Sequence, residues 1–250
     1  MNTQSTTPDF SKIFVRCSSI GALMTEPQSK ADKEAGNLSQ TAIAECISIY
    51  SRFVDGRSTD IYSPAVLKGN RVEEDSITLL SEFDKSFYVK NDVRLHNEYI
   101  TGECDIHVMP QRKIIDIKSS WTNETYLKSI LSPLSKDYYW QGQGYCWLYD
   151  CDVFEIAFCL VDAPFEMVES EKRKYLWSIG NPAEFNDDIH RKLEQIEKNM
   201  TFTDIPKHQR VYKHVIARND EDIARIPAKV EKVRAELERI WKVRNHITTK

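Results

Sequence analysis

The stretch IIDIKS at residues 114–119 reads as a β-strand that carries a carboxylate and an ammonium group on one side. Isoleucines flank the aspartate on both faces, so the strand is expected to be buried rather than to lie at an edge. Asp116 and Lys118 are two positions apart and therefore project to the same face. Since a buried carboxylate requires a partner, this strand is the first candidate for a functional site.

A second acid precedes this strand across a short turn. The segment MPQR at residues 109–112 is a polar turn between two runs rich in β-branched residues, which predicts a β-hairpin. With Val108 opposite Lys113, Asp105 lands opposite Asp116, where facing Cβ atoms lie roughly 5 Å apart. The two charges repel unless a divalent cation that prefers oxygen ligands lies between them. The alternative is a solvated pair on a surface hairpin, which the apolar surroundings of Asp116 disfavour.

A third acid lies upstream, in residues 63–80, which predict one helix with Ser63 as its N-cap and Pro64 at its first position. Glu73 falls on the apolar face of this helix and Glu74 on the polar face. The apolar residues on the face of Glu73 are Val66, Ile77 and Leu80. Glu73 is therefore expected to point inward and to be the functional glutamate, the alternative being a capped or snorkelling side chain.

A fourth element combines a helix and a strand. Residues 138–149 predict a buried, aromatic-rich helix, and residues 153–161 predict a buried strand after it. Gln141 and Tyr145 are four apart and so share a helical face, where an amide and a phenol could orient a carboxylate, a lysine or a water. Gln143 is the alternative glutamine, and Gln141 could instead satisfy backbone groups in a packed core.

The order of these residues resembles the PD-(D/E)XK nuclease superfamily, specifically its phage-type recombination exonucleases, the lambda-exonuclease or YqaJ-like group. The residues that carry the resemblance are Glu73, Asp105, Asp116-Ile117-Lys118, Gln141 and Tyr145. FVRCSSIGALM at residues 14–24 is similar to the opening segment of that group, and GNRVEED at residues 69–75 is similar to its Gly-x-x-x-Glu helix. Asp116 stands where the group commonly has a glutamate. The six cysteines form no C-x-x-C pair, so we expect no iron–sulfur cluster.

The resemblance implies a metal-dependent phosphodiesterase with Mg²⁺ or Mn²⁺ as its cofactor. Asp105, Asp116 and the backbone carbonyl of Ile117 would ligate the metal, and Glu73 would hold a metal-bound water or a second metal. Lys118 would orient the attacking water or help to deprotonate it. The residues that position this network would be Gln141 and Tyr145.

The opening segment implies a second subsite, because in the resembling group a serine that follows a basic residue helps to hold the DNA 5′ phosphate. Ser19 and Arg16 are the candidates here, with Ser18 and Lys12 as alternatives that spacing alone does not separate. A helix N-terminus offers free backbone N–H groups to an anion. The competing interpretation is that Ser18 and Ser19 only cap the helix.

We expect a single α/β domain over residues 1–250, with a restriction-endonuclease-like core at about 14–218 and a final helix at about 226–247. A central mixed β-sheet from about 85–119 and 153–161 would be flanked by the helices.

Further amphipathic helices are predicted for packing. One spans residues 36–54, and its apolar face carries Ile43, Ile47 and Tyr50. Another opens at Pro182 and carries Phe185, Ile189, Leu193, Ile196 and Met200 on one face. The final helix has an apolar seam of Ile226, Val230, Val233, Leu237 and Ile240. We expect this seam to dock on the body of the protein, the alternative being another subunit.

Composition indicates a soluble intracellular protein. The chain has 250 residues and 41% hydrophobic content, enough for one sizeable core, and it has no apolar run long enough to span a bilayer. The first residues lack a signal core, and six scattered cysteines are typical of reduced cytosolic thiols. A net charge of −4 argues against a generally basic surface, but a nucleic-acid enzyme needs only a local positive groove.

The resemblance adds the reaction and the setting. It implies 5′→3′ digestion of linear double-stranded DNA from its ends, which leaves 3′ overhangs for phage-type homologous recombination. The partners would be DNA ends and a single-strand annealing protein, in the cytoplasm of a bacterial or phage-infected bacterial cell. Relatives of the lambda type form a toroidal trimer, which would be the homo-oligomer here. The alternatives are an endonuclease with the same core and a catalytically inactive DNA-binding or interaction module.

Overall fold

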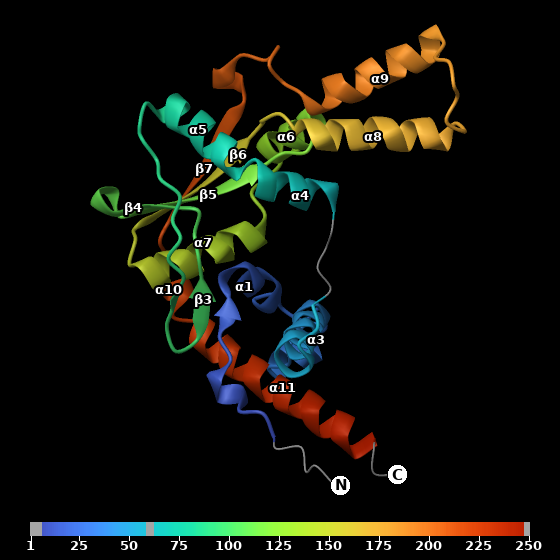
Figure 1. Ribbon diagram of the computed structural model, residues 1–250. Helices are drawn as coiled ribbons and strands as arrows, with labels where there is room; N and C mark the ends of the chain where they lie inside the picture. Colours follow the sequence, from blue (N-terminus) through green and yellow to red (C-terminus); the bar gives the residue numbers. More distant parts are fainter. Residues whose placement is uncertain (1–6, 59–62, 248–250) are drawn as a thin grey trace.

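A computed structural model describes residues 7–58 and 63–247 of this chain. Its centre is a four-stranded sheet in the order β4-β5-β6-β7 (Figure 1). The strands are β4 (Ile106–Val108), β5 (Lys113–Ser119), β6 (Val153–Cys159) and β7 (Val211–Ala217). β5 and β6 run parallel, whereas β4 and β7 are antiparallel to their neighbours. The predicted α/β class, a mixed sheet flanked by helices, is therefore confirmed.

A smaller sheet has three strands in the order β1-β3-β2. Its strands are β1 (Val15–Arg16), β2 (Leu95–His96) and β3 (Ile100–Gly102). The expected single sheet from about 85–119 is therefore divided between two sheets. The chain leaves β3 at Cys104 and Asp105, whose carbonyl groups accept hydrogen bonds from Asn91 instead of pairing as a strand. The central sheet gains β7 from the far end of the chain.

Helices cover both faces of the central sheet (Figure 1). They are α1 (Cys17–Leu23), α2 (Lys30–Glu34), α3 (Gln40–Asp55), α4 (Pro64–Arg71), α5 (Glu73–Asp84), α6 (Asn123–Leu131), α7 (Lys136–Tyr149), α8 (Phe165–Ser178), α9 (Asp187–Met200), α10 (Asp220–Ile223) and α11 (Ile226–Ile247). Short 3-10 turns are η1 (Phe10–Lys12), η2 (Met109–Gln111) and η3 (Lys207–Gln209). Because side chains alternate along β5, Ile114 packs on the α7 side, and Ile115 and Ile117 pack with α5.

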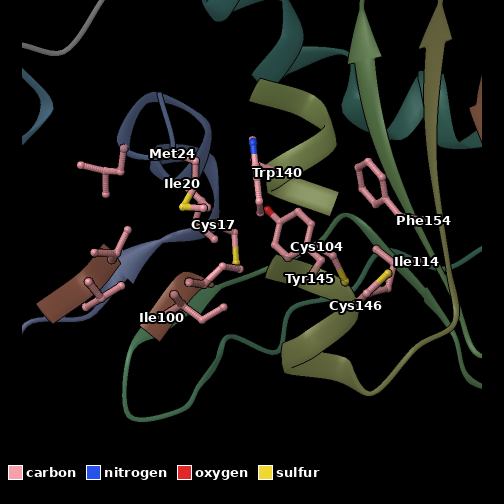
Figure 2. Close-up of a cluster of buried hydrophobic side chains, with 14 of the residues drawn as sticks. Cys17, Ile20, Met24, Ile100, Cys104, Ile114, Trp140, Tyr145, Cys146 and Phe154 are labelled. Carbon is pink, nitrogen blue, oxygen red and sulfur yellow. The ribbon is translucent and has the colours of Figure 1, made fainter. Parts of the chain in front are cut away.

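Two glycines allow α7 to approach its neighbours closely. A side chain on Gly142 would collide with the ring of Phe154 in β6, and one on Gly144 would collide with Ile20 of α1. Figure 2 shows α7 with Ile20 on one side and Phe154 on the other. The face of α7 that carries Tyr145 is therefore enclosed between α1 and the sheet.

The predicted helix over residues 63–80 is two helices. Ser63 caps α4 through the N–H of Val66, and Pro64 is its first residue, as expected. The helical path is interrupted at Val72, whose backbone has φ −109° and ψ 16°. Val72 is 1% exposed and belongs to the core beneath the sheet. The break at this buried residue separates α4 from α5, and Glu73 is the first residue of α5.

Two other helices differ from the prediction in register. On α3, which Ser39 caps, the buried face carries Ala42, Cys46 and the predicted Tyr50, whereas the predicted Ile47 is 55% exposed. The side chain of Asn186 accepts the N–H of Ile189 and so starts α9 there, four residues after the predicted Pro182. Phe185 therefore precedes the helix instead of contributing to its apolar face. α8 and α9 pack as a pair that projects from the body (Figure 1).

The final helix docks on the body, as expected. Its seam residues Ile226, Val230, Val233 and Leu237 are each at most 2% exposed, and Ile240 packs at the edge of the same core. α11 contacts α3 and η1. In the part of the chain that the structure describes, no helix is long and apolar enough to cross a membrane.

Candidate active site

The site begins where β4 ends. Val108 lies opposite Lys113, which confirms the predicted hairpin register, and the last pair is Ile106 with Ile115. Beyond this pair the side chain of Asp105 takes the place of a strand neighbour, because its Oδ2 accepts the N–H of Ile117 at 2.5 Å. The carboxylate of Asp105 is thereby fixed at the edge of β5.

The carbonyl group of Ile117 shares this edge. In a strand the N–H and C=O of one residue point to the same neighbour, and the N–H of Ile117 points to Asp105. β4 has already ended at this level, so the carbonyl faces the open end of the hairpin beside the Asp105 carboxylate. This arrangement suits the predicted use of that carbonyl as a ligand.

Asp116 belongs to β5 and directly precedes Ile117. Its side chain is 3% exposed, and Lys118 Nζ lies 2.5 Å from its Oδ2. Burial alone would lower the pKa of Lys118, but the adjacent carboxylate of Asp116 outweighs this and leaves that pKa raised. Burial and the negative charge of Asp116 raise the pKa of Asp105 to about 7. The two carboxylates therefore carry more negative charge than the surroundings of Asp105 balance.

Gln141 reaches this pair from α7. Its Nε2 lies 3.4 Å from Oδ1 of Asp116 and 3.3 Å from the hydroxyl of Tyr145. The Tyr145 hydroxyl donates to the carbonyl of Glu103 at 2.9 Å, which ties α7 to the approach to β4. All the contacts run through buried or half-buried groups, so the amide has little freedom to turn away.

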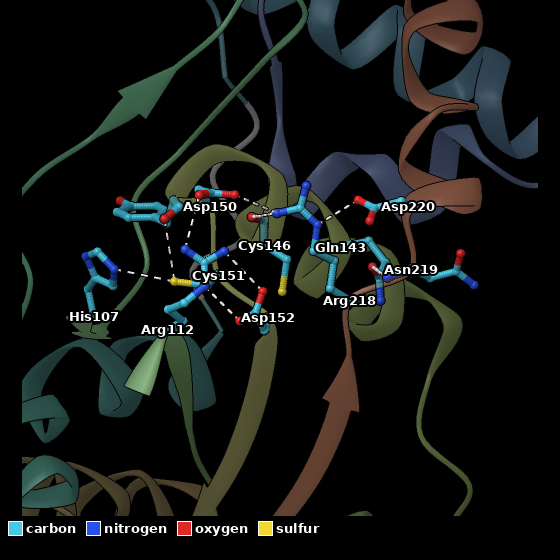
Figure 3. A network of polar contacts seen from close by, with 11 residues as sticks. His107, Arg112, Gln143, Cys146, Asp150, Cys151, Asp152, Arg218, Asn219 and Asp220 are labelled. Carbon is cyan, nitrogen blue, oxygen red and sulfur yellow. Dashed lines mark hydrogen bonds and ion pairs between the residues drawn. The ribbon is translucent and has the colours of Figure 1, made fainter. Parts of the chain in front are cut away.

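Gln143 serves another part of the fold. Its Nε2 donates to the carbonyl of Ala217 at 2.9 Å, and its Oε1 accepts the N–H of Asn219 at 2.7 Å. Figure 3 shows Gln143 and Asn219 beside the ion-pair network of Arg218. Gln143 is two residues from Gln141 and therefore points to the opposite side of α7. Of the two glutamines, Gln141 is the one that the structure places beside Asp116.

Glu73 faces the same cavity as Asp105 and Lys118. This open cavity, of about 510 Å³, lies between α4, α6 and the end of β5, and all three side chains line it. The Oε2 of Glu73 lies 2.6 Å from Lys90 Nζ. Glu74 is exposed and does not line the cavity. The structure thus brings Glu73, not Glu74, to the acids.

Two residues of this site were missed by the sequence reasoning. The ring of Tyr138 lies 5.6 Å from Lys118 Nζ and packs edge-to-face on Phe158, so it forms a wall of the cavity. Lys90 lies in the irregular segment after α5, where no periodicity marks it. One tyrosine among the many aromatic residues of α7, and one lysine in a loop, have no sequence pattern that marks them as site residues.

The predicted 5′-phosphate residues lie around the start of α1. Arg16 is the N-cap, and no side chain caps the helix there, so Ser18 and Ser19 lie in the first turn rather than at the cap. Ser19 is 7% exposed and Ser18 is exposed. Lys12 is exposed and lies 3.1 Å from Asp9. These four residues do not line the cavity of Glu73, but α1 packs directly on α7.

The donor set fits a hard divalent cation in part. Asp105, Asp116 and the carbonyl edge at Ile117 supply oxygens, and the raised pKa of Asp105 marks a place where a cation would be stabilised. Within residues 7–58 and 63–247, no three side chains of His, Cys, Asp or Glu form a group that could hold a metal ion. Glu73 would have to exchange Lys90 for a cation to join them.

Solved structures that are similar to this chain include two exonucleases. A crystal structure of a phage-related exonuclease from Haemophilus somnus 129PT is 31% identical, with a TM-score of 0.70, and the match covers 92% of this chain and 96% of that one. An alkaline exonuclease from Laribacter hongkongensis, LHK-Exo, is 13% identical with a TM-score of 0.61, over 94% of this chain and 93% of its own. The second likeness shows the fold alone. No protein-family model and no curated protein matches the chain.

An identity of 31% over almost the full length of both chains establishes common descent with the Haemophilus exonuclease. The resemblance seen in the sequence is confirmed. This chain therefore belongs to the phage-related exonucleases of the lambda-exonuclease type, within the PD-(D/E)XK nuclease superfamily.

Proposed function

We propose that this protein is a metal-dependent exonuclease that digests linear double-stranded DNA 5′→3′ and leaves 3′ overhangs for phage-type homologous recombination. The observation that supports it most directly is the cluster of Asp105, Asp116 and Lys118 at an open cavity, with Gln141 fixed behind it. Descent from exonucleases supports the reaction class. The DNA backbone supplies the phosphate that such a cluster would act on.

The residues have separate tasks in this proposal. Asp105, Asp116 and the Ile117 carbonyl hold Mg²⁺ or Mn²⁺, which when bound supplies Lewis-acid stabilisation of the phosphate and a more acidic water. Lys118 orients the attacking water and offsets negative charge that develops on the phosphate oxygens. Glu73, at the cavity wall, would hold a metal-bound water or a second metal. The residues that keep Asp116 in place are Gln141 and Tyr145.

The start of α1 supplies the subsite for the DNA end. Ser19 and Arg16 receive the 5′ phosphate, with Ser18 and Lys12 beside them. α1 packs against α7, which also carries Gln141, so a duplex end held at α1 would lie within reach of the acids. A homotrimer and a single-strand annealing protein complete the proposed assembly, and a bacterial or phage-infected cytoplasm is its setting.

The test uses linear and covalently closed circular duplexes of the same sequence with Mg²⁺. The proposal expects mononucleotides from the linear form alone, with label at the 5′ end released before label at the 3′ end. Cutting of the closed circle would establish the endonuclease alternative, and two intact substrates would establish the inactive module. Asp116→Asn is the matched control, because an amide keeps the shape of the side chain but lowers cleavage by about a thousandfold or more.

A further inference from the structure

Lys68 is a completely buried lysine beside the candidate site. It is 0% exposed, and its Nζ donates to the carbonyl of Ser120 at 2.7 Å and of Trp121 at 3.4 Å. The ammonium group also lies 5.0 Å from the centre of the Phe202 ring. An unpaired buried charge is costly, so these carbonyls and this ring are what make the position tolerable.

Lys68 is also the residue that fixes α4 to the body of the protein. All eight residues of α4 are described, and Lys68 is the buried one among them, while Val66 and Leu67 are 48% and 37% exposed. α4 therefore lacks the apolar stripe that normally holds a surface helix to a core. A hydrogen bond to a carbonyl fixes direction as well as distance, whereas apolar contact is non-directional.

The carbonyl of Ser120, which accepts the hydrogen bond from Lys68, lies one residue after the end of β5. Ser119 ends β5 directly after Lys118, and Ser120 comes next. Ser76 of α5 makes a second tie to the same point, because its hydroxyl and that of Ser119 lie 2.8 Å apart. Ser76 is 0% exposed. Consecutive residues at the end of β5 thus hold α4 and α5.

Glu73 lies between these two ties. It follows Lys68 by five residues and precedes Ser76 by three, just after the break at Val72. A break in a helix leaves the next residue free to shift unless both flanking segments are fixed. Here both are fixed to the strand end beside Lys118.

We propose that Lys68, helped by Ser76, is a positioning residue that sets Glu73 in register with the Asp116–Lys118 strand. The inference rests on the proposed nuclease function and deepens it. Lys68 does not line the cavity, but Ser120 and Trp121, whose carbonyls it contacts, do, so it acts through this backbone and the path of α4. Its removal should therefore mimic the loss of Glu73, not the loss of DNA affinity.

The experiment is a double-mutant cycle between Lys68→Met and Glu73→Gln on linear duplex DNA. We expect Lys68→Met to lower kcat about 10- to 100-fold with KM changed less than about 2-fold, since small misplacements near the chemistry have such effects. Glu73→Gln should then lower kcat much less in the Lys68→Met background than in the wild type. A purely structural role would leave the effect of Glu73→Gln undiminished.

Arg234→Met is the matched control. Arg234 is also buried, donates to two carbonyls, those of Ile13 and Glu98, and lies 5.5 Å from the Tyr99 ring, but it belongs to α11. Its effect should be independent of Glu73→Gln. Equal coupling in both cycles would overturn the positioning role and leave the nuclease assignment intact.

Hydrogen exchange tests the tie without any activity. The N–H of Val72 donates to Lys68 and that of Ser76 to Val72, so these two amides report on the joint between α4 and α5. They should exchange at least about tenfold faster in Lys68→Met than in the wild type and unchanged in Arg234→Met. If Lys68→Met does not fold, Ser76→Ala replaces it in both measurements. Unchanged exchange would overturn the tie even if the wild type proved to have no nuclease activity.

Discussion

Asp105 accepts the main-chain N–H of Ile117 at 2.5 Å, and this contact continues the hairpin pairing one step beyond the end of β4. A side chain thus replaces a strand, and it leaves a carboxylate rather than a carbonyl at the edge of β5. Burial, together with the neighbouring acid Asp116, then raises the pKa of Asp105. The geometry that builds the site also strains it electrostatically.

Asp105→Asn should stabilise the protein when no divalent cation is present. The amide oxygen can still accept the N–H of Ile117, while the repulsion from Asp116 is gone. We expect a gain of about 1 kcal/mol in unfolding free energy, together with loss of cleavage. Urea unfolding with a chelator measures the first effect and a linear duplex the second.

Divalent cation should reverse this order. Mg²⁺ stabilises the wild type by binding the native state and should do much less for Asp105→Asn, so their unfolding midpoints should converge or cross as Mg²⁺ is added. A variant that is less stable than the wild type in chelator would mean that the Asp105 carboxylate is not in conflict with Asp116.

Substitution of the two adjacent glutamates should have clearly different effects on cleavage. Glu73→Gln removes a charge that faces the cavity, and we expect kcat to fall about 100-fold. Glu74→Gln changes an exposed side chain of the same turn and should stay within about 2-fold of the wild type. Steady-state digestion of a linear duplex compares them, and the reverse ranking would show that the cavity is not the reaction site.

The sequence predicts this part of the molecule well because its signals are local. The register of the hairpin follows from the turn at 109–112, and the burial of Asp116 follows from the isoleucines around it. The sequence also predicts which glutamate faces inward. Glu73 and Glu74 lie in the same turn of α5, after the break at Val72, so the break does not change their relative directions.

The features that the sequence does not predict depend on contacts between residues that are distant in sequence. Nothing in α4 indicates that Lys68 is buried, because its carbonyl partners lie about fifty residues later. On α3, the burial of Cys46 and the exposure of Ile47 follow from where α11 and α1 dock, not from hydrophobicity. The division of residues 85–119 between two sheets likewise depends on Asn91 binding the turn before β4.

Substitution of Gln141 should affect cleavage, and substitution of Gln143 should affect stability. Gln141→Leu removes the amide beside Asp116, and we expect kcat to fall about 10-fold or more with little loss of stability. Gln143→Leu leaves the carbonyl of Ala217 and the N–H of Asn219 without their partner and should cost about 1–3 kcal/mol of unfolding free energy. Measuring kcat per folded molecule together with urea unfolding separates the two. Equal kinetic losses would contradict the assignment of Gln141.

Stability should depend on the charge of Lys68 at alkaline pH. Burial lowers the pKa of Lys68 from 10.5 to about 8, with Asp162 opposing the shift. Between these values the unfolded chain holds a proton that the native protein has released, so the unfolding free energy rises with pH, by up to about 1.4 kcal/mol per unit. Below pH 8 both states are protonated and the dependence disappears.

Urea unfolding of the wild type and of Lys68→Met from pH 7 to 10.5 tests this, because the difference between them cancels the other titrating groups. The wild type should gain on the variant only above about pH 8. A difference that stays flat across this range would mean that the carbonyls of Ser120 and Trp121 keep the ammonium fully charged.

Phosphorylated 5′ ends should be degraded faster than hydroxyl ends. The first turn of α1 contains Ser18 and Ser19 after Arg16, and backbone N–H groups at a helix start favour an anion. Matched duplexes that differ only at the 5′ terminus measure the preference, which we expect to be about 10-fold or more in kcat/KM.

Single substitutions then locate the anchor. Ser19→Ala and Arg16→Ala should each reduce the phosphate preference while leaving the rate on hydroxyl ends nearly unchanged, because the acids at β5 are intact in both. Since α1 has no side-chain cap, Ser19→Ala should not carry the stability loss of about 1 kcal/mol that removal of a capping serine produces. A wild type without any preference would remove the anchor. A preference that survives both substitutions would move it to another residue, and Lys12, exposed next to β1, is the first to substitute.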